Sequence, residues 1–194
     1  MFQATCQTQL QQVIPPANTR PVRVFSQDES RFGFLTIRRR RLTARGVQPV
    51  GPVQHVFEWC YVYGAVEPTT GERCFLELPY LNAAMFQLCV DAFAHAFPHS
   101  LNILLLDNSG AHTAAQLTLP QNVRLLFLPP YGPELSPIER VWRDVKDKLA
   151  WQQFTDLEAQ QDGLSTLLRA YEADTLQSLT GYPSLVEAIY ALRV

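Results

Sequence analysis

Residues 101–107 read LNILLLD, an apolar run that ends in an acid. A continuous apolar segment of this length is typical of a β-strand covered on both faces of a sheet. Residues 82–97 carry apolar side chains at the spacing of an amphipathic helix, which Pro98 ends. Residues 123–128 (VRLLFL) predict a second buried strand. This alternation of helices and strands predicts an α/β domain in which helices pack on a sheet.

The chain before residue 80 has a different pattern, rich in aromatic and β-branched side chains. Strand patterns occupy residues 22–27, 32–37, 55–66 and 74–78. The first of them ends at Asp28, and a turn over 67–71 joins the last two. These segments predict an antiparallel meander, which the later strands extend into a mixed sheet.

The two ends of the chain differ in their helical signal. Residues 1–14 are rich in Gln and show little apolar stripe, and Pro15-Pro16 ends whatever they form. We therefore expect residues 1–20 to be a linker or a remnant, and 21–194 to be one domain. An apolar stripe beginning at Ile138 predicts a helix, and its other members are Val141, Trp142, Val145 and Leu149.

The composition is that of a globular protein, with 47% hydrophobic and 18% charged residues and a net charge of −2. The charge is unevenly distributed. Residues 1–50 hold eight arginines against Asp28 and Glu29, so they carry a formal charge of +6, and the remainder carries −8. This asymmetry suggests one surface that meets a polyanion.

Several classes of protein are not indicated by the sequence. The four cysteines are scattered without a CxxC pair, which signals neither a zinc site nor a disulfide framework and fits a reducing cytosol. No secretory signal is evident at the N-terminus. The longest apolar stretch, 83–97, is too short and too polar to span a bilayer. We therefore expect a cytoplasmic protein with no membrane partner.

Three carboxylates at the edges of hydrophobic segments are candidate functional residues: Asp28, Asp107 and Glu139. Oxygen ligands hold hard divalent cations such as Mg²⁺. Two such ions can stabilise both the attacking and the leaving oxygen of a phosphodiester. Three acids brought together from distant parts of the sequence would suffice for such a site.

Each acid also has a structural interpretation. Asp107 emerges from a central strand, where ligands gather in α/β sheets, but it could instead cap the next turn. Asp28 shares strand parity with Val22 and Val24, which favours it over Glu29 as the inward group. For Glu139, the run Ser136-Pro-Ile-Glu139 fits a capping box with proline at the first helical position.

Further candidates lie beside these acids. Asn108 and His112 could support a site at Asp107, although a lone histidine is more often structural. Arg38 to Arg41 could be a solvated strand edge. Four adjacent arginines nevertheless put charge on both faces of a strand, which suits phosphate neutralisation. The candidate DNA-binding residues are therefore Arg38, Arg39, Arg40, Arg41 and Arg45.

Four segments together resemble the DDE transposases of bacterial insertion sequences related to the Tc/mariner superfamily. They are VFSQDESRFG (24–33), FEWCYVYGAVEPTTG (57–71), LLLDNSGAH (104–112) and LPPYGPELSPIERVW (128–142). The resemblance covers roughly residues 20–150, and its last motif is long and specific. It identifies 21–194 as a catalytic domain.

The resemblance implies an RNase H-like fold, with a five-stranded mixed sheet flanked by helices. It implies that Asp28, Asp107 and Glu139 bind Mg²⁺ or Mn²⁺, with two ions expected. The reaction it implies is hydrolysis of DNA at transposon ends, followed by attack of the freed 3′-hydroxyl on target DNA. The implied partners are both DNAs and a second copy of the chain on paired ends, in a bacterial cytoplasm at the nucleoid.

One departure from the family pattern concerns DNA recognition. Relatives usually carry helix-turn-helix modules before the catalytic core, whereas about twenty residues precede the first catalytic strand here. The sequence therefore leaves two alternatives. The chain is the catalytic half of a split product, acting with a separate helix-turn-helix polypeptide, or it is a silent remnant that binds DNA or transposase and inhibits transposition. A junction resolvase with the same fold is a weaker alternative, since the proline-rich motif does not fit it.

Overall fold

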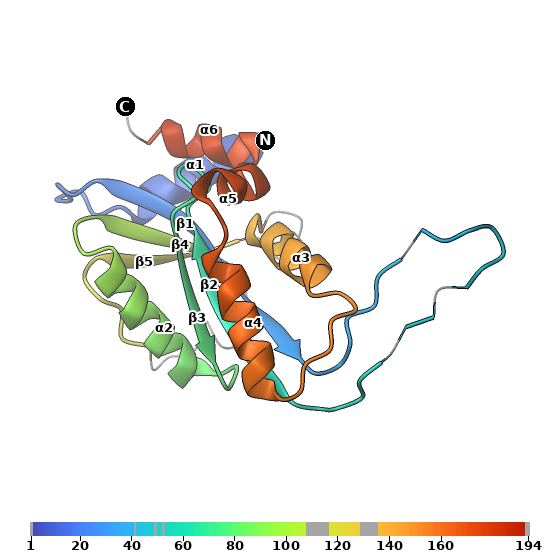
Figure 1. Ribbon diagram of the computed structural model, residues 1–194. Coiled ribbons are helices and arrows are strands. Elements are labelled where there is room, and N and C mark those ends of the chain that lie inside the picture. Colours follow the sequence, from blue (N-terminus) through green and yellow to red (C-terminus); the bar gives the residue numbers. More distant parts are fainter. Residues whose placement is uncertain are drawn as a thin grey trace.

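The protein is built on one five-stranded sheet in the order β3-β2-β1-β4-β5 (Figure 1). A computed structural model describes residues 2–40, 42–48, 50–51, 53–107, 117–128 and 136–192. The strands are β1 (Val22–Gly33), β2 (Trp59–Val66), β3 (Arg73–Leu78), β4 (Leu101–Leu106) and β5 (Val123–Phe127). β1 to β3 pair antiparallel, whereas β1, β4 and β5 run parallel. The predicted combination of an antiparallel meander and parallel strands is confirmed.

The helices cover both faces of this sheet. They are α1 (Phe2–Val13), α2 (Ala83–Ala96), α3 (Ile138–Lys148), α4 (Leu157–Arg169), α5 (Ala173–Thr180) and α6 (Pro183–Tyr190). α2 packs on one face, where Phe86 and Phe93 meet Phe25 of β1 and Leu104 of β4. The other helices pack on the opposite face. Strand β4 is buried along its whole length, as the apolar run at 101–106 predicted.

Strand β1 is longer than the sequence indicated. It runs unbroken through Asp28 and pairs with β2 from Ser26, opposite Val66, to Gly33, opposite Trp59. The prediction of two separate strands at 22–27 and 32–37 is therefore wrong. The polar side chains between the two patterns do not interrupt the strand, because ladder hydrogen bonds use the backbone and tolerate polar side chains. Asp28 thus lies within a strand rather than at its end.

Residues 2–13 form helix α1 where the sequence predicted a linker or remnant. Its side chains Cys6 and Leu10 are buried against Val24 of β1, Ile103 of β4 and α6. Figure 1 shows α1 and α6 side by side, near both termini. The weak apolar stripe did not predict this helix, because the buried side chains of Cys6 and Leu10 are enough to pack it against the sheet and α6. The domain boundary at residue 20 remains a prediction.

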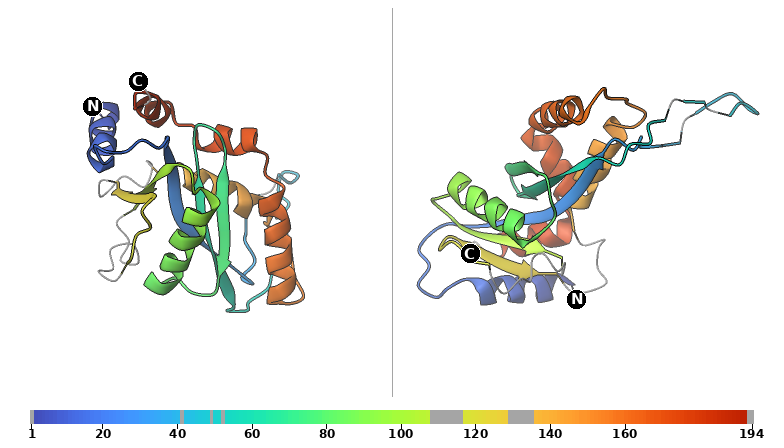
Figure 2. Two further views of the ribbon diagram at one scale, coloured as in Figure 1. Left: turned by 90° about the vertical axis from the view of Figure 1, so that its left-hand side faces the viewer. Right: turned by 90° about the horizontal axis from the view of Figure 1, so that it is seen from below.

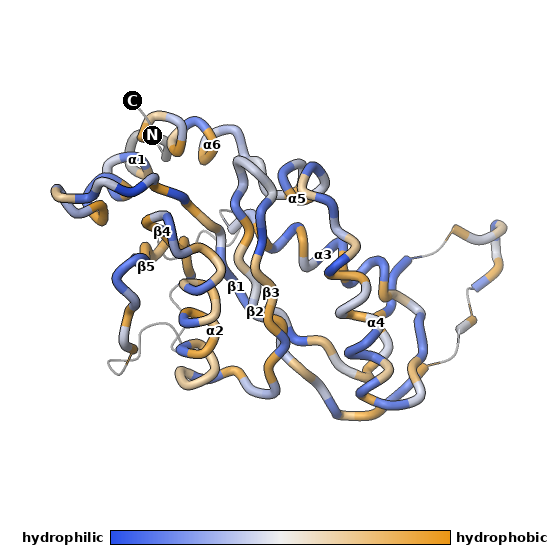
Figure 3. Tube along the Cα trace, turned by 60° about the vertical axis from the view of Figure 1, so that its left-hand side comes forward, coloured by the Kyte–Doolittle hydropathy of each residue, from blue (hydrophilic) through white to orange (hydrophobic). Residues whose placement is uncertain are grey.

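The described residues between 34 and 58 form an arm that projects from the body of the molecule (Figure 2). Backbone hydrogen bonds join its two limbs at the base, from Phe34 N to Glu58 O (3.0 Å) and from Thr36 N to Gln54 O (3.4 Å). Its described residues form neither helix nor strand. Hydrophobic stretches lie along it in the open (Figure 3), and Leu42 and Val50 are fully exposed.

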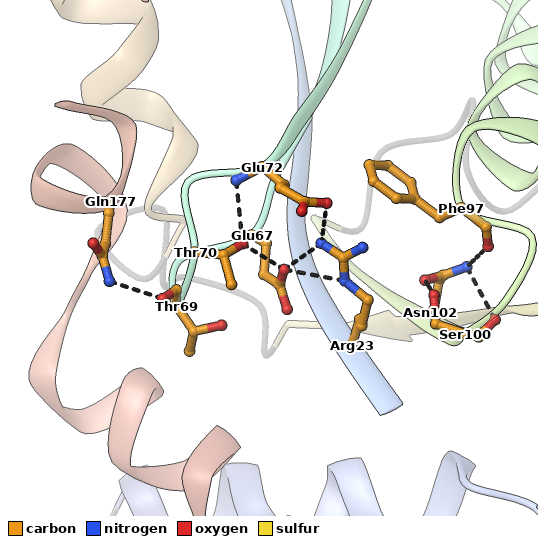
Figure 4. A network of polar contacts seen from close by, with 9 residues as sticks. All are labelled: Arg23, Glu67, Thr69, Thr70, Glu72, Phe97, Ser100, Asn102 and Gln177. Carbon is orange, nitrogen blue, oxygen red and sulfur yellow. Dashed lines mark hydrogen bonds and ion pairs between the residues drawn. The ribbon is translucent and has the colours of Figure 1, made fainter. Parts of the chain in front are cut away.

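A polar network fixes the start of β1 to the β2–β3 turn (Figure 4). Arg23 donates to the buried carboxylate of Glu67 (Nε to Oε2, 3.1 Å) and also pairs with Glu72. Thr70 Oγ1 donates to the same Glu67 oxygen. The positive charge of Arg23 is therefore neutralised by carboxylates of the fold itself. Among the residues described, no helix is long and apolar enough to cross a membrane.

Candidate active site

Asp28 lies near the middle of β1, opposite Gly64 of β2, and its side chain is mostly buried. The indole Nε1 of Trp142 on α3 donates to Asp28 Oδ2 over 3.1 Å. Its side chain therefore points to the α3 face of the sheet, as the parity with Val22 and Val24 predicted. Glu29 shares the opposite parity and accepts a hydrogen bond from Gln27 Nε2 (2.8 Å).

Asp107 directly follows β4 and is exposed. Parallel pairing of β1 with β4 ends where Ser26 lies beside Leu105, and the same register continued by two residues would bring Asp28 next to Asp107. Strand alternation gives Asp107 the parity of Ile103 and Leu105, which pack on the same face as Val24. The alternative role as a turn cap depends on residues 108 and 109, which lie outside the described residues.

Glu139 is exposed in the first turn of α3, whose N-terminus is attached to β1. The backbone N–H of Ile138 donates to Ser26 Oγ (3.4 Å), two residues before Asp28. The N-cap residue is Pro137, and no side chain caps the helix. Glu139 N instead bonds the backbone oxygen of Ser136 (3.2 Å). The capping-box interpretation is therefore wrong, which leaves the Glu139 carboxylate available.

The electrostatics of Asp28 reflect the charges of the other two acids. The pKa of Asp28 is raised to about 7, chiefly by burial and next by the charge of Glu29, against a backbone hydrogen bond that lowers it. The charges of Asp107 and Glu139 also raise the pKa of Asp28. Because such interactions weaken with distance, both carboxylates lie in its neighbourhood. The three acids of β1, the end of β4 and α3 are thus within electrostatic reach of one another.

The chemistry of this site fits a hard divalent cation. It offers carboxylate oxygens, the ligands that Mg²⁺ and Mn²⁺ prefer. The negative charges of Asp107 and Glu139 still raise the pKa of Asp28, so they are not fully offset by nearby cations. In the part of the chain that the structure describes, which includes Asp28, Asp107 and Glu139, no three acidic, His or Cys side chains lie close enough together as they stand to hold a metal ion. A cation bound among these carboxylates would offset the repulsion between their charges.

Residues 23–161 match the sequence model of a DDE superfamily endonuclease. The chain belongs to this family. An uncharacterized protein of Sinorhizobium fredii, y4pE/y4sA, is 40% identical over 96 residues, which are 46% of this chain and 67% of that protein. The resemblance of the sequence motifs to DDE transposases is thereby confirmed at the level of the family.

Solved structures of Mos1 transposase share the fold of this DDE-family chain. One is a paired-end complex with the left transposon end (TM-score 0.65, 19% identity), and another is a mariner paired-end complex with Mn (TM-score 0.65, 18% identity). Each match covers 97% of this chain and 59% of the Mos1 chain. The predicted RNase H-like fold is confirmed, and the chain spans about three fifths of the Mos1 length.

Lys146 is a cation within electrostatic reach of Asp28 and Glu139 that sequence reasoning missed. It lies on α3 two turns after Glu139, and its Nζ is 5.6 Å from the centre of the Phe32 ring. Burial lowers the pKa of Lys146, Arg39 and Arg31 add to this, and the charges of Asp28 and Glu139 oppose it. The signal was available in the sequence, because residues seven apart share one face of a helix.

The predicted DNA-binding arginines lie on the arm rather than on a strand edge. Arg38, Arg39, Arg40 and Arg45 are exposed, and Arg41 lies outside the described residues. Arg39 forms an ion pair with Asp147 of α3, which ties the base of the arm to the helix that carries Glu139. Asn108 and His112, the two further candidates near Asp107, also lie outside the described residues.

Proposed function

We propose that this chain is the catalytic core of a transposase, which cleaves DNA at transposon ends and joins the freed 3′-hydroxyl to target DNA. The observation that carries the proposal is that the charges of Asp107 and Glu139 both raise the pKa of Asp28, which supports a common site for the three acids. Membership of the DDE endonuclease family supports it. The Mos1 structures with a transposon end and with Mn also support it, through a shared fold.

In the cleavage step, water attacks a backbone phosphorus, the P–O3′ bond breaks, and the departing oxygen takes a proton to become a 3′-hydroxyl. In the joining step, this hydroxyl attacks a target phosphorus and displaces the target's own 3′ oxygen. Asp28, Asp107 and Glu139 would hold two Mg²⁺ or Mn²⁺ ions, which activate the attacking oxygen and stabilise the leaving one. No covalent protein intermediate is needed.

DNA would lie across the α3 face, with its backbone along the arm. The exposed arginines Arg38, Arg40 and Arg45 carry charge suited to phosphates, and Arg41 joins them by sequence. Lys146 would supply a positive charge to a phosphate bound at these acids, because it lies within electrostatic reach of Asp28 and Glu139. We further propose that two copies act on paired ends and that a separate helix-turn-helix polypeptide or segment recognises those ends.

A plasmid-nicking assay with Mn²⁺ tests this function. Alanine at Asp28, Asp107 or Glu139 should abolish nicking, while Asp91→Ala on the exposed face of α2 should nick like the wild type. Joining is tested separately with a precleaved 3′-hydroxyl end and a supercoiled target. A wild type that binds DNA but neither nicks nor joins would favour the silent remnant, and acid variants that nick normally would refute the site.

A further inference from the structure

The indole of Trp142 forms a hydrogen bond with one of the proposed catalytic acids, Asp28, and no sequence motif indicated this contact. Trp142 is 4% exposed, and its Nε1 donates to Asp28 Oδ2 (3.1 Å). We infer that Trp142 is a positioning residue: it holds one oxygen of Asp28 so that the other, Oδ1, is presented to a metal ion. This inference rests on the proposed function.

The indole is held in a slot that glycine creates. Gly64 lies opposite Asp28, and a Cβ added there would come within 2.5 Å of Trp142 Cη2 and 2.7 Å of Cζ2. Phe32 packs against the ring at 6.3 Å between centroids, nearly edge-on at 72°, and Phe75 at 5.9 Å. Glycine inside a strand marks such a close approach. The ring plane, and hence the direction of its N–H, is therefore fixed by packing.

This contact also links two of the acids. Trp142 follows Glu139 by three residues, so both lie on one side of α3 within a single turn. A bond from Trp142 to β1 therefore sets the distance between the helix that carries Glu139 and the strand that carries Asp28. The Ile138 N–H to Ser26 Oγ bond fastens the same helix one turn earlier (3.4 Å).

An indole suits this position chemically. It has a single N–H donor, no acceptor and no charge, so it can stabilise the Asp28 carboxylate without replacing a metal ion as its counter-charge. A lysine or arginine at this place would form an ion pair with Asp28 and compete with the metal. Side chains that orient a metal ligand are commonly worth 10–100-fold in metal affinity.

The test measures Mn²⁺ binding to the full chain by isothermal titration calorimetry, beside Mn²⁺-supported nicking. Trp142→Phe keeps an aromatic ring but removes the N–H, and we expect its Mn²⁺ dissociation constant to rise about 10-fold or more. Trp151→Phe is the matched control, since Trp151 Nε1 donates to Arg39 O (3.2 Å) away from the acids, and its Mn²⁺ affinity should not change. A purely structural role would change the unfolding midpoint but not the Mn²⁺ affinity of the folded protein.

A second substitution guards against misfolding. Benzothienylalanine at position 142 keeps the shape of the indole and replaces N–H by sulfur, so it should weaken Mn²⁺ binding like Trp142→Phe. If both variants bind Mn²⁺ within about twofold of a wild type that binds and nicks, the positioning role is wrong and the proposed function stands. If the wild type itself neither binds Mn²⁺ nor nicks, the proposed function and the inference both fail.

Discussion

The acid site and the arm are built in opposite ways. Asp28 and Glu139 lie on β1 and α3, elements that pack through buried residues such as Phe32, Val141 and Trp142. The arm at 34–58 is irregular in its described residues and exposes apolar side chains such as Leu42 and Val50. Folding therefore orders the elements that carry the proposed catalytic acids, whereas the arm leaves charged and apolar groups exposed. The predictions below test this contrast, from the largest expected effect to the smallest.

The largest effect should come from a single carboxylate of the acid site. Glu139→Gln keeps size and helix propensity but loses a metal ligand, and we expect Mn²⁺-supported nicking to fall about 1,000-fold or more, as several kcal/mol of metal-dependent stabilisation are lost. Glu158→Gln is the matched control, because Glu158 is also a first-turn glutamate, on α4. If the two variants lose nicking equally, the loss is not specific to Glu139, and its role as a metal ligand is wrong.

Helix α1 should contribute to the stability of the fold through its buried side chains. Leu10 is fully buried against β1 and β4, so Leu10→Ala should lower the free energy of unfolding by about 2–4 kcal/mol in urea. Leu88 of α2 is a helical leucine that is 50% exposed, and Leu88→Ala should cost less than about 1 kcal/mol. If both variants lower the free energy of unfolding by the same small amount, residues 1–20 contribute little to stability and act as a linker.

The arm should govern DNA affinity without affecting the fold. Replacing Arg38, Arg40 and Arg45 together by Ala should weaken binding to a DNA duplex by about 10–100-fold and reduce the slope of log affinity against log salt by roughly 2–3, as each lost phosphate contact removes about 0.9. The free energy of unfolding should stay within about 0.5 kcal/mol, since these side chains are exposed.

A charge-matched triple variant separates position from net charge. It replaces three arginines outside the arm by Ala: Arg20, Arg124 and Arg169. Fluorescence anisotropy over a range of salt should show a smaller loss of affinity than for the arm variant. The same loss in both would mean that DNA responds to total charge and that the arm has no special role.

The smallest effect concerns the stability cost of the acid site. The pKa of Asp28 is about 7 in the folded protein against about 3.9 in an unfolded chain, so the folded state binds the extra proton between these values. Stability should therefore fall as pH rises from about 4 to 7. Asp28→Asn removes this cost and, in EDTA, should stabilise the protein by roughly 1–2 kcal/mol at about pH 8 and not at about pH 4. Urea unfolding at both pH values tests it, and a variant less stable at pH 8 would contradict it.

Much of the scaffold was predictable because its signals are local. The apolar run at 101–106 and the stripe from Ile138 to Leu149 each bury a continuous surface, and both became the expected elements. Strand β1 was harder, since its polar middle pairs through backbone groups that carry no side-chain signal. Helix α1 was missed because its packing depends on Cys6 and Leu10 meeting a helix at the other end of the chain.

The site was only partly predictable for a related reason. Each acid had a local structural alternative, and for Glu139 only the missing side-chain cap decides against it. Trp142 was predicted as a core residue of its helix stripe, which its burial confirms. Its contact with Asp28 joins residues 114 apart in the sequence, and its slot depends on Gly64. Such contacts follow from the three-dimensional register of β1, β2 and α3, which no local pattern encodes.

The central claim is that the three acids hold the ions that cleave DNA. A crystal structure of the chain with a DNA end, soaked in Mn²⁺ and recorded for anomalous scattering, tests it most directly. The claim predicts an anomalous peak within about 2.0–2.3 Å of carboxylate oxygens of Asp28, Asp107 and Glu139. If, at saturating Mn²⁺, the anomalous map showed no peak at these acids, or a peak only elsewhere on the chain, the claim would be contradicted.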